Sequence, residues 1–477
     1  MTIYSLVLVL GCRVRTRNNA TNRRVVCFHL LVVASLFLAP FNQSFAEIRP
    51  VQQIREISAG ILQLYTHPKD SIKRKAAEYL LEGLPRQWHY DTHVLEETGV
   101  MKKVMDVEVI DADYLFENIE YAFQAWALPW ARDVSFEDFC RYLLPYKMGN
   151  EAPERWRAAV WEEYASLREA AIAEPGMRPS EVCRRVDAFV NTWYTVHYND
   201  NYPTDAGYLK AKELRGGTCA GASLMILYPL RALGVCATYE CVPHWGNRSS
   251  SHAWNALYEN GQLIQFNGPE LDPGRTKEEF IGVGRMLRKR PKVLRKDYLS
   301  AGKIDVTTEY IPTADLDIRG RGEQSGKPGL MVFDNERWCS VAEGAWRGRR
   351  AVFPAVARGV AFLPVVSENG RGQAFSWPLV VERNGRLKLF RPRLWRRTVR
   401  LTAKYPEDES NAVTPGKRYE LFYWRGGWVS LGVREATDSV LICHRVPKGA
   451  LLLLRDLDSD KRRERIFAYE NGKQVWY

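Results

Sequence analysis

The spacing of apolar residues changes along this chain, and the change limits what the chain can fold into. Up to about residue 200 the apolar residues recur with a helical period. In "DSIKRKAAEYLLEGL", for example, Ile72, Ala76, Leu80 and Leu84 form one stripe. Ser135 opens "SFEDFCRYLLPY" in the position of an N-cap, which marks a helix start. The first region is therefore predicted to be helical.

Between about 201 and 275 the pattern becomes one helix followed by short strands. The run "CAGASLMILYPLRALGV" has helical spacing and ends at Gly234, the position of a C′ glycine. Strands are expected in "CATYECVP", "SHAWNALYENG" and "QLIQFNG", with a hairpin turn at Asn260 and Gly261. Such a turn pairs residues whose numbers sum to about 521. A helix packed on an antiparallel sheet is predicted here.

Beyond residue 300 the helical period disappears, and short apolar runs alternate with Asn, Gly, Asp and Pro. This spacing is typical of one or two β-sandwich domains. The predicted class is α+β, in which a helical domain precedes the helix-on-sheet core and β-sandwich domains follow it. The predicted boundaries are 1–46 for a signal peptide, 47–200 for the helical domain, 201–300 for the core, 301–395 for a β-rich domain and 396–477 for a C-terminal β-sandwich.

The first 46 residues have the pattern of a secretory signal peptide. Arg23 and Arg24 precede an apolar run, and small residues, Ser44 and Ala46, stand where cleavage is expected. An exported protein, periplasmic, secreted or at the cell surface, is predicted, with no stable membrane span after cleavage. The apolar run is also nearly long enough for an uncleaved anchor, and "LVLVLGC" leaves lipidation at Cys12 as an alternative.

Composition excludes several classes of protein. With 46% hydrophobic residues among 477, the chain can bury substantial cores and is not a disordered protein. Its net charge of +12 is accompanied by no recognised nucleic-acid motif, so no nucleic-acid partner is expected. Nine cysteines include no CxxC pair, which argues against a structural zinc site and a redox dithiol. Seven of them follow the leader, so at least one thiol is expected to be free.

Cys219, in "GGTCAGASLMILYPLRALGV", is the best candidate for a nucleophile. At a helix start, unpaired N–H groups and the helix dipole would favour its thiolate. Gly216 and Gly217 would let the backbone approach a substrate, and the Cys219 N–H could contribute to an oxyanion hole. The alternative is a free cysteine buried in a helical core, a common place for this residue.

Two further residues complete a possible thiol triad. His252 begins a predicted strand, Trp254 follows it on the same face, and Asn267 lies within two positions of the residue expected opposite His252. An asparagine there could hold the imidazole by a hydrogen bond. His244, in the loop before His252, could line the same cleft. No HxxxH or HExxH spacing accompanies these residues, so neither a metal site nor any other cofactor is predicted.

The run from "GGTCAGASLMILYPLRALGV" to "SHAWNALYENGQLIQFNG" resembles the transglutaminase-like superfamily, which has a papain-like thiol fold. That family presents a cysteine at a helix start, His-x-Trp on a strand, and an aspartate about fifteen residues after the histidine. Here that position is Asn267, which can orient the ring but carries no charge. Flanking stretches such as "ENIEYAFQAWALPWARDVSFEDFC" and "VPHWGNRSSSHAWN" resemble exported multidomain members of the Bacteroidetes type.

The resemblance implies a cysteine peptidase, hydrolase or acyltransferase acting on peptide or glutamine amide bonds. Cys219 would be the nucleophile, His252 the base and then the acid, and Asn267 the orienting group. Substrate contacts are expected from Gly217, Trp254 and His244, and hydrolysis is favoured over transfer because no dedicated amine site is evident. The alternative is a noncatalytic surface protein that binds peptide or glycan.

Overall fold

The computed structural model describes residues 51–197, 202–274, 288–320, 326–368, 371–405, 411–459 and 464–477. The chain divides into two compact units, Met1–Gly60 and Ile61–Tyr477. In the first unit, residues 51–60 are described and are helical. The predicted signal peptide lies outside the described residues. No helix among those described is both long and apolar enough to span a bilayer.

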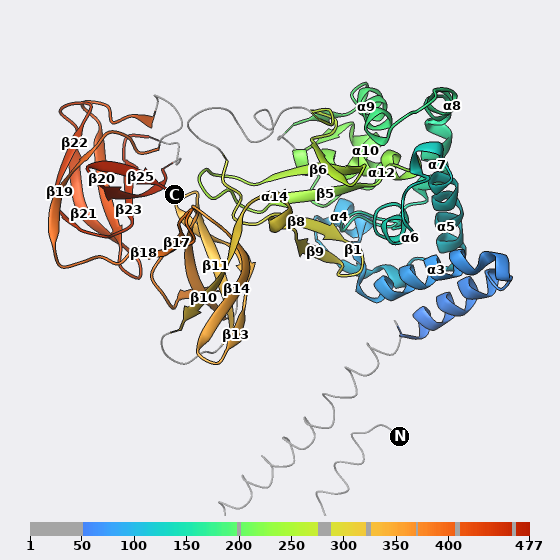
Figure 1. Cartoon of the computed structure of the whole chain (residues 1–477), viewed down its shortest axis with the longest axis horizontal. Coiled ribbons are helices and arrows are strands. Elements are labelled where there is room, and N and C mark those ends of the chain that lie inside the picture. The colour runs from blue at the N-terminus through green and yellow to red at the C-terminus, as the bar shows by residue number, and fades with distance from the viewer. Residues whose placement is uncertain are drawn as a thin grey trace, which may run out of the picture. The chain divides into compact units, whose positions relative to one another are not determined.

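Helices dominate the described chain up to residue 232, as the blue to green ribbons of Figure 1 show. Side chains start several of them: Asp91, Asp111 and the predicted cap Ser135 each accept the N–H of the residue three positions on. The helices are α3 (Ser71–Gly83), α4 (Thr92–Thr98), α5 (Ala112–Trp126), α6 (Phe136–Asp138), α7 (Trp156–Glu163), α8 (Ala165–Ala173), α9 (Pro179–Val190), α10 (Tyr208–Leu214), α11 (Cys219–Met225) and α12 (Leu227–Ala232).

The predicted stripe of α3 is confirmed in most of its length. Ala76, Leu80 and, just after the helix, Leu84 are fully buried, whereas Ile72 in the first turn is exposed. Two short pairs of strands lie among the helices. They are β1 (Trp88–Tyr90) with β2 (Lys103–Met105), antiparallel, and β3 (Thr195–Val196) with β4 (Gly216–Gly217), parallel.

The predicted helix-on-sheet arrangement is present after β4. Gly234 has a φ of 69° just past α12, which confirms it as the glycine that ends the helix. The following strands form one antiparallel sheet in the order β7-β6-β5-β8-β9. They are β5 (Ala237–Val242), β6 (His252–Glu259), β7 (Gln262–Phe266), β8 (Leu294–Asp297) and β9 (Gly302–Asp305).

The hairpin between β6 and β7 has the predicted turn and the predicted register. Asn260 and Gly261 both have positive φ, 52° and 72°, as a two-residue turn of type I′ requires. The paired residues run from Glu259 with Gln262 to Asn255 with Phe266, and each pair of numbers sums to 521. The sequence of the turn therefore sets which residues of β6 and β7 lie opposite each other.

The two faces of this sheet bury different clusters. One face, which includes Tyr239, Cys241 and Ala253, joins the large core that also contains α11, α12 and the helices before them. The opposite face buries a smaller cluster around Trp254, with Val242, Trp245, Val293 and Val306. Both faces of the sheet thus bury apolar side chains, each in a different cluster.

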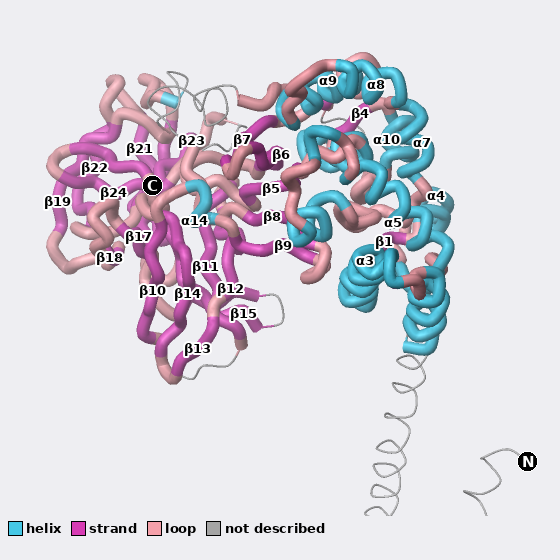
Figure 2. The backbone as a smooth tube through the Cα atoms, turned by 45° about the vertical axis from the view of Figure 1, so that its right-hand side comes forward, coloured by secondary structure: helices cyan, strands magenta, loops and turns pink. Residues whose placement is uncertain are grey.

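Beyond β9 the described residues contain one helix, α14 (Thr307–Tyr310), and otherwise strands and loops, drawn magenta and pink in Figure 2. This part of the chain is β-rich, and the mixture of helices with several separate sheets is compatible with the predicted α+β class. The strands are β10 (Thr313–Arg319), β11 (Lys327–Asp334), β12 (Arg337–Glu343), β13 (Ala345–Arg347), β14 (Arg350–Ala357), β15 (Ala361–Glu368), β16 (Arg371–Ala374), β17 (Leu379–Val381), β18 (Leu387–Leu389), β19 (Arg396–Leu401), β20 (Arg418–Trp424), β21 (Trp428–Glu435), β22 (Leu441–Pro447), β23 (Leu452–Asp456), β24 (Ile466–Glu470) and β25 (Lys473–Trp476).

These strands pair only in the antiparallel sense, in four sheets. The sheets have the orders β10-β14-β13, β12-β11-β15-β17-β18 with β16 beside β15, β19-β22, and β21-β20-β23-β24-β25. Trp424 is buried in this region and packs against Trp428, with ring centroids 5.1 Å apart. The division of the chain into the five predicted domains, with β-sandwiches at its end, stays a prediction.

Candidate thiol site

Cys219 is the first residue of α11, as predicted, and is partly exposed. The Thr218 hydroxyl caps the helix by accepting the Gly221 N–H at 3.2 Å. Helical backbone continues through Ile226 into α12, because Ile226 itself has right-handed helical φ and ψ. The thiol therefore stands at the amino end of helical structure that runs to Ala232, where the helix dipole favours a negative charge.

Exposure distinguishes Cys219 from most other cysteines of the chain. Seven cysteines are described, all are free thiols, and only Cys219 and Cys339 are not fully buried. Burial raises the pKa of the Cys140 thiol to about 12 and also raises the pKa of the other buried thiols, which keeps them protonated near neutral pH. These are Cys183, Cys236, Cys241 and Cys443.

The glycine pair before Cys219 is held by β3 and covered by a tyrosine. Gly216 and Gly217 form β4, and a Cβ added at Gly217 would lie 2.7 Å from the Tyr194 hydroxyl. The same hydroxyl would lie 3.1 Å from a Cβ at Gly221. Tyr194 thus lies beside Gly217 and Gly221, the glycines on either side of Cys219, a contact that sequence spacing gave no signal for.

His252 is the first residue of β6, as predicted, and its ring lies among aromatic rings and arginines. Its centroid is 6.1 Å from that of Trp245 and 6.0 Å from that of Trp254. Burial, together with the charges of Arg288, Arg290 and Arg248, lowers the pKa of His252 to about 4. The imidazole is therefore neutral at pH 7.

The register of β6 determines from which face of the sheet the His252 side chain projects. The Asn255 amide donates to the Ser223 carbonyl at 2.8 Å, so Asn255 faces α11. Side chains alternate along a strand, so His252 and Trp254 project from the opposite face, where Trp254 is fully buried against Tyr310. The helix that carries Cys219 therefore covers one face of the sheet, and the His252 side chain projects from the other face. Trp254 lies in the core.

Asn267 follows β7 directly, one residue past Phe266, which pairs with Asn255. By the same alternation Asn267 starts from the His252 face. Its amide donates to the Glu270 carboxylate at 2.8 Å, and its backbone forms a bridge with Leu271. The structure thus places two of the three predicted triad residues on one face of the sheet and the third on the other.

His244, expected to line the same cleft, instead contacts the β-rich region. Its Nδ1 lies 2.6 Å from Oδ2 of Asp334, the last residue of β11. Asp334 is 90 positions away in the chain, a separation at which sequence spacing carries no information. This contact belongs to a cluster of donor atoms considered below.

A polar cavity of about 190 Å³ lies near the edge of the sheet formed by β8 and β9. Lys296 and Lys303, both in its lining, come from these strands, while Gln87, Met148 and Asn150 come from the helical region. The Lys296 ammonium also lies 5.2 Å from the ring centroid of Tyr239, and Tyr239 pairs with Asn255 and so shares the face of the sheet that α11 covers. The cavity is therefore adjacent to the Cys219 side of the sheet.

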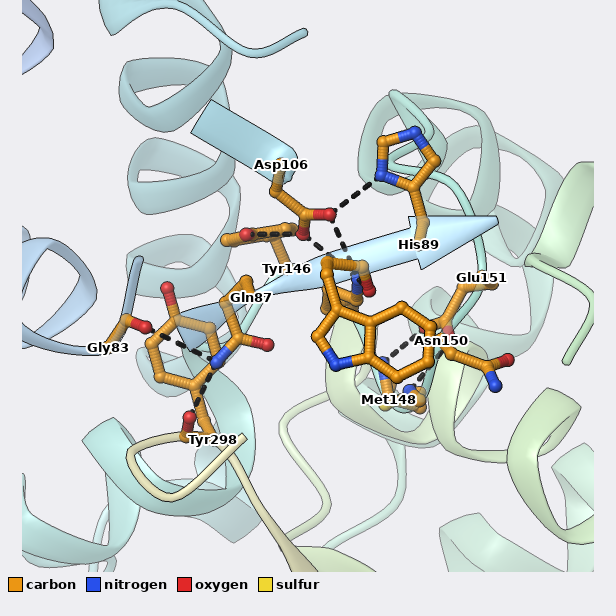
Figure 3. Close-up of polar contacts among 12 residues, drawn as sticks. Gly83, Gln87, His89, Asp106, Tyr146, Met148, Asn150, Glu151 and Tyr298 are labelled. Atoms are coloured by element: carbon orange, nitrogen blue, oxygen red, sulfur yellow. Dashed lines mark hydrogen bonds and ion pairs between the residues drawn. The ribbon is translucent and has the colours of Figure 1, made fainter. Parts of the chain in front are cut away.

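The walls of this cavity are fixed by buried polar contacts, drawn in Figure 3. Asp106 accepts hydrogen bonds from the Tyr146 hydroxyl at 2.7 Å and from Lys147 at 2.9 Å, and His89 Nδ1 lies 2.8 Å away. Glu151 accepts the N–H groups of Met148 and Gly149, which shapes the loop at the cavity.

No protein-family model matches this chain, and no curated protein matches it. A provisionally assigned cysteine protease from Cytophaga hutchinsonii is similar over 30% of this chain, at 14% identity and a TM-score of 0.23. The similar part spans 45% of that chain. Red sea bream transglutaminase is similar over 80% of this chain and 76% of its own, at 12% identity and a TM-score of 0.21.

Proposed function

We propose that this chain is a thiol enzyme in which Cys219 attacks the carbonyl carbon of a peptide bond or a glutamine amide. The observation that carries the proposal is the position of Cys219. It is a partly exposed free thiol at the first residue of a capped helix, while five other described cysteines are buried. A helix amino end favours both the thiolate and the negative oxygen that forms when sulfur adds to a carbonyl.

The chemistry proceeds through a thioester. The Cys219 sulfur bonds to the carbonyl carbon, and the carbon–nitrogen bond then breaks as a proton is given to the leaving amine or ammonia. Water or a second amine attacks the thioester, restores the thiol and releases the acid or the new amide. Hydrolysis is the favoured outcome, because water is always present and no group of the chain is assigned to hold an acceptor amine.

His252 is proposed as the base and then the acid, and Asn267 as the group that orients it. The observation that supports these roles is that the His252 and Asn267 side chains start from the same face of the sheet. Cys219 lies on the opposite side of the sheet from the His252 ring. Because His252 is the first residue of β6, its side chain must pass the end of this strand to contact the thiol. Asn267 must exchange its Glu270 bond for one to the ring.

The substrate is proposed to be a protein or peptide. Gly217, two residues before the thiol, and His244, whose ring also contacts Asp334, remain the proposed substrate contacts. The cavity next to Tyr239 adds a place for a polar or acidic side chain of the peptide, since Arg141, Lys296 and Lys303 line it. Trp254 is proposed to act indirectly, by supporting the ring of His252 from the core.

A peptide mixture rich in glutamine tests the activity. Peptide cleavage and ammonia release are followed by mass spectrometry and a coupled assay, using wild type, Cys219→Ala and the matched control Cys339→Ala. We expect activity in wild type and in the control, with an acyl adduct on Cys219 in both. We expect neither activity nor adduct in Cys219→Ala. Equal activity in Cys219→Ala would contradict the proposal.

The second candidate function is a noncatalytic module that binds peptide. The observation that favours it is the sheet itself, which separates the starting faces of Cys219 and His252. A peptide that binds with the same affinity to wild type and Cys219→Ala, without any turnover, would support this candidate over the enzyme.

A further inference from the structure

Three side chains with metal-ligating atoms meet where the loop 243–251 contacts the hairpin of β11 and β12. One donor atom each from His244, Asp334 and Cys339 lies within 4.8 Å of the other two. The histidine comes from the loop between β5 and β6, and the other two residues come from the hairpin. The fold therefore brings together nitrogen, oxygen and sulfur donors that sequence spacing does not connect.

The hairpin places Asp334 and Cys339 on one face. Asp334 pairs with Arg337, and Cys339 is two residues further along β12, so the two side chains are diagonal neighbours on the same side. Asn335 and Glu336 form the turn, with positive φ of 46° and 63°. The relative positions of the carboxylate and the thiol are thus set by a tight hairpin.

The loop is fixed against the same carboxylate. The Ser250 N–H points at both Asp334 oxygens, at 3.2 and 3.3 Å, with a φ of 87° at Ser250 that a residue with a side chain rarely adopts. The Trp245 N–H donates to the Ser250 carbonyl at 3.1 Å and closes the loop. His244 is therefore presented to Asp334 by a constrained backbone.

The compactness of the cluster distinguishes a metal site from a catalytic triad. In a triad the histidine stands between the acid and the nucleophile, so the acid and the sulfur contact different ring nitrogens and lie far apart. Here the Asp334 oxygen, the Cys339 sulfur and one His244 nitrogen are mutually close. A single ion bound at metal–ligand distances of about 2.0 to 2.3 Å could bind all three atoms after small movements of the side chains.

We propose that His244, Asp334 and Cys339 bind one divalent cation of the zinc class. Imidazole nitrogen, carboxylate oxygen and thiolate sulfur are the donors that zinc takes in proteins, and three protein ligands leave a fourth position open. The His244 side chain is 31% exposed, whereas that of Asp334 is 4% exposed, so the ion has access from the histidine side.

Charge balance is consistent with this assignment. A carboxylate and a thiolate carry two negative charges, which a divalent cation neutralises. The thiolate, not the thiol, is the metal ligand, so the ion displaces the thiol proton when it binds. Binding therefore releases a proton from Cys339 and replaces the hydrogen bond between His244 and Asp334.

A bound ion would also connect two parts of the chain. The loop 243–251 leads into β6, and the hairpin belongs to the β-rich region. Because a ligand that binds only the folded protein stabilises it, zinc should raise the melting temperature of the full chain. The inference does not depend on the proposed thiol chemistry, since Cys219 takes no part in the site.

The test uses the full chain after removal of metals with a chelator. Zinc chloride is titrated by calorimetry, and cobalt chloride is titrated with absorption read in the near ultraviolet. We expect one equivalent of zinc to bind, a sulfur-to-cobalt charge-transfer band, and a higher melting temperature with zinc. Cys339→Ser should abolish the band, and His244→Gln should weaken zinc binding by at least about tenfold.

Cys219→Ala is the matched control, since it removes the other partly exposed thiol and should leave zinc affinity and the cobalt band unchanged. Circular dichroism confirms that each variant is folded, and His244→Gln provides a second variant that keeps the Ser250 contact to Asp334. The inference is overturned if wild type binds no zinc at millimolar concentration. It is equally overturned if Cys339→Ser and His244→Gln bind zinc as wild type does.

Discussion

At the scale of single residues, His252 is the clearest case of a side chain whose properties come from its surroundings. Burial and three arginines, Arg288, Arg290 and Arg248, all disfavour the imidazolium form. An unperturbed histidine has a pKa of about 6.5, so folding lowers the proton affinity of this ring. The ring is neutral at pH 7, and keeping it neutral in the folded protein destabilises the fold in acid.

The stability of the protein should therefore fall as the pH drops from about 6.5 to 4. In that window the unfolded chain binds a proton at His252 and the folded chain does not, so the contribution is present above 6.5 and is lost toward the folded pKa of about 4. His252→Gln should flatten this pH dependence by an amount on the order of 2 kcal/mol. Urea unfolding at pH 7 and 4.5 measures it; an identical pH dependence in both proteins would contradict the prediction.

Much of the candidate site could be predicted from sequence at this scale. Cys219 at a helix start, His252 at a strand start and Asn267 after the next strand follow from local periodicity and from the turn at Asn260 and Gly261. The side of the sheet that the helix covers could not be predicted, because it depends on tertiary packing. The contact of Tyr194 with the glycine pair arises from residues that are distant along the chain and was missed for the same reason.

At the scale of elements, the start of α11 depends on one hydroxyl. Thr218 accepts the Gly221 N–H, which would otherwise lack a partner within the helix. Thr218→Ala should lower the free energy of unfolding by about 1 kcal/mol, while Thr218→Ser, which keeps the hydroxyl, should change it little. Thermal and urea unfolding compare the stability of the three proteins. Equal losses of stability in both variants would show that the missing hydroxyl is not what destabilises Thr218→Ala.

A second helix start is sensitive to pH. Glu154 accepts the N–H groups of Leu209 and Lys210 at the beginning of α10, and burial raises its pKa to about 7. An unfolded glutamate titrates near 4.3, so this contribution to stability is present below that pH and is lost as the pH rises through about 7.

Glu154→Gln should remove that dependence. We expect wild type to lose on the order of 2 kcal/mol more than the variant between pH 4.5 and 8, since an amide does not ionise. Urea unfolding at the two pH values gives the comparison. A variant that loses as much stability as wild type over this range would contradict the assignment of the raised pKa to Glu154.

At the scale of the whole molecule, the second compact unit is held together partly by the contacts of the loop 243–251. Arg465 donates to the Gly246 carbonyl at 2.9 Å, and a Cβ added at Gly246 would meet the Val360 side chain at 2.8 Å. Lys292, two residues before β8, donates hydrogen bonds to two carbonyls of β14, those of Pro354 and Ala355. The helix-on-sheet core and the β-rich region are joined by packed polar contacts.

Gly246→Ala should therefore disrupt this junction. Overpacking of a close contact typically costs about 1 to 3 kcal/mol, and the loop would shift away from Val360. Gly427→Ala is the matched control, because nothing lies within 4 Å of a Cβ at that position. Melting temperatures of the two variants provide the measurement, and equal shifts would mean that the junction is not tightly packed.

The order of helical, mixed and β-rich regions could also be predicted, since each has its own apolar period. The pairing of β9 with β8 could not, because residues in neither strand carry a local signal for it. Neither could the cluster of His244, Asp334 and Cys339, which exists only through the junction. Export through the leader stays a prediction.

The central claim is that Cys219 is an activated thiol, and alkylation tests it most directly. The protein is treated with iodoacetamide across a pH series, and mass spectrometry follows each cysteine in wild type and His252→Ala. We predict that Cys219 is labelled well below pH 8, faster than Cys339 and a model thiol, and that the variant slows this reaction. Labelling of Cys219 no faster than the model thiol, or unchanged in His252→Ala, would contradict the account.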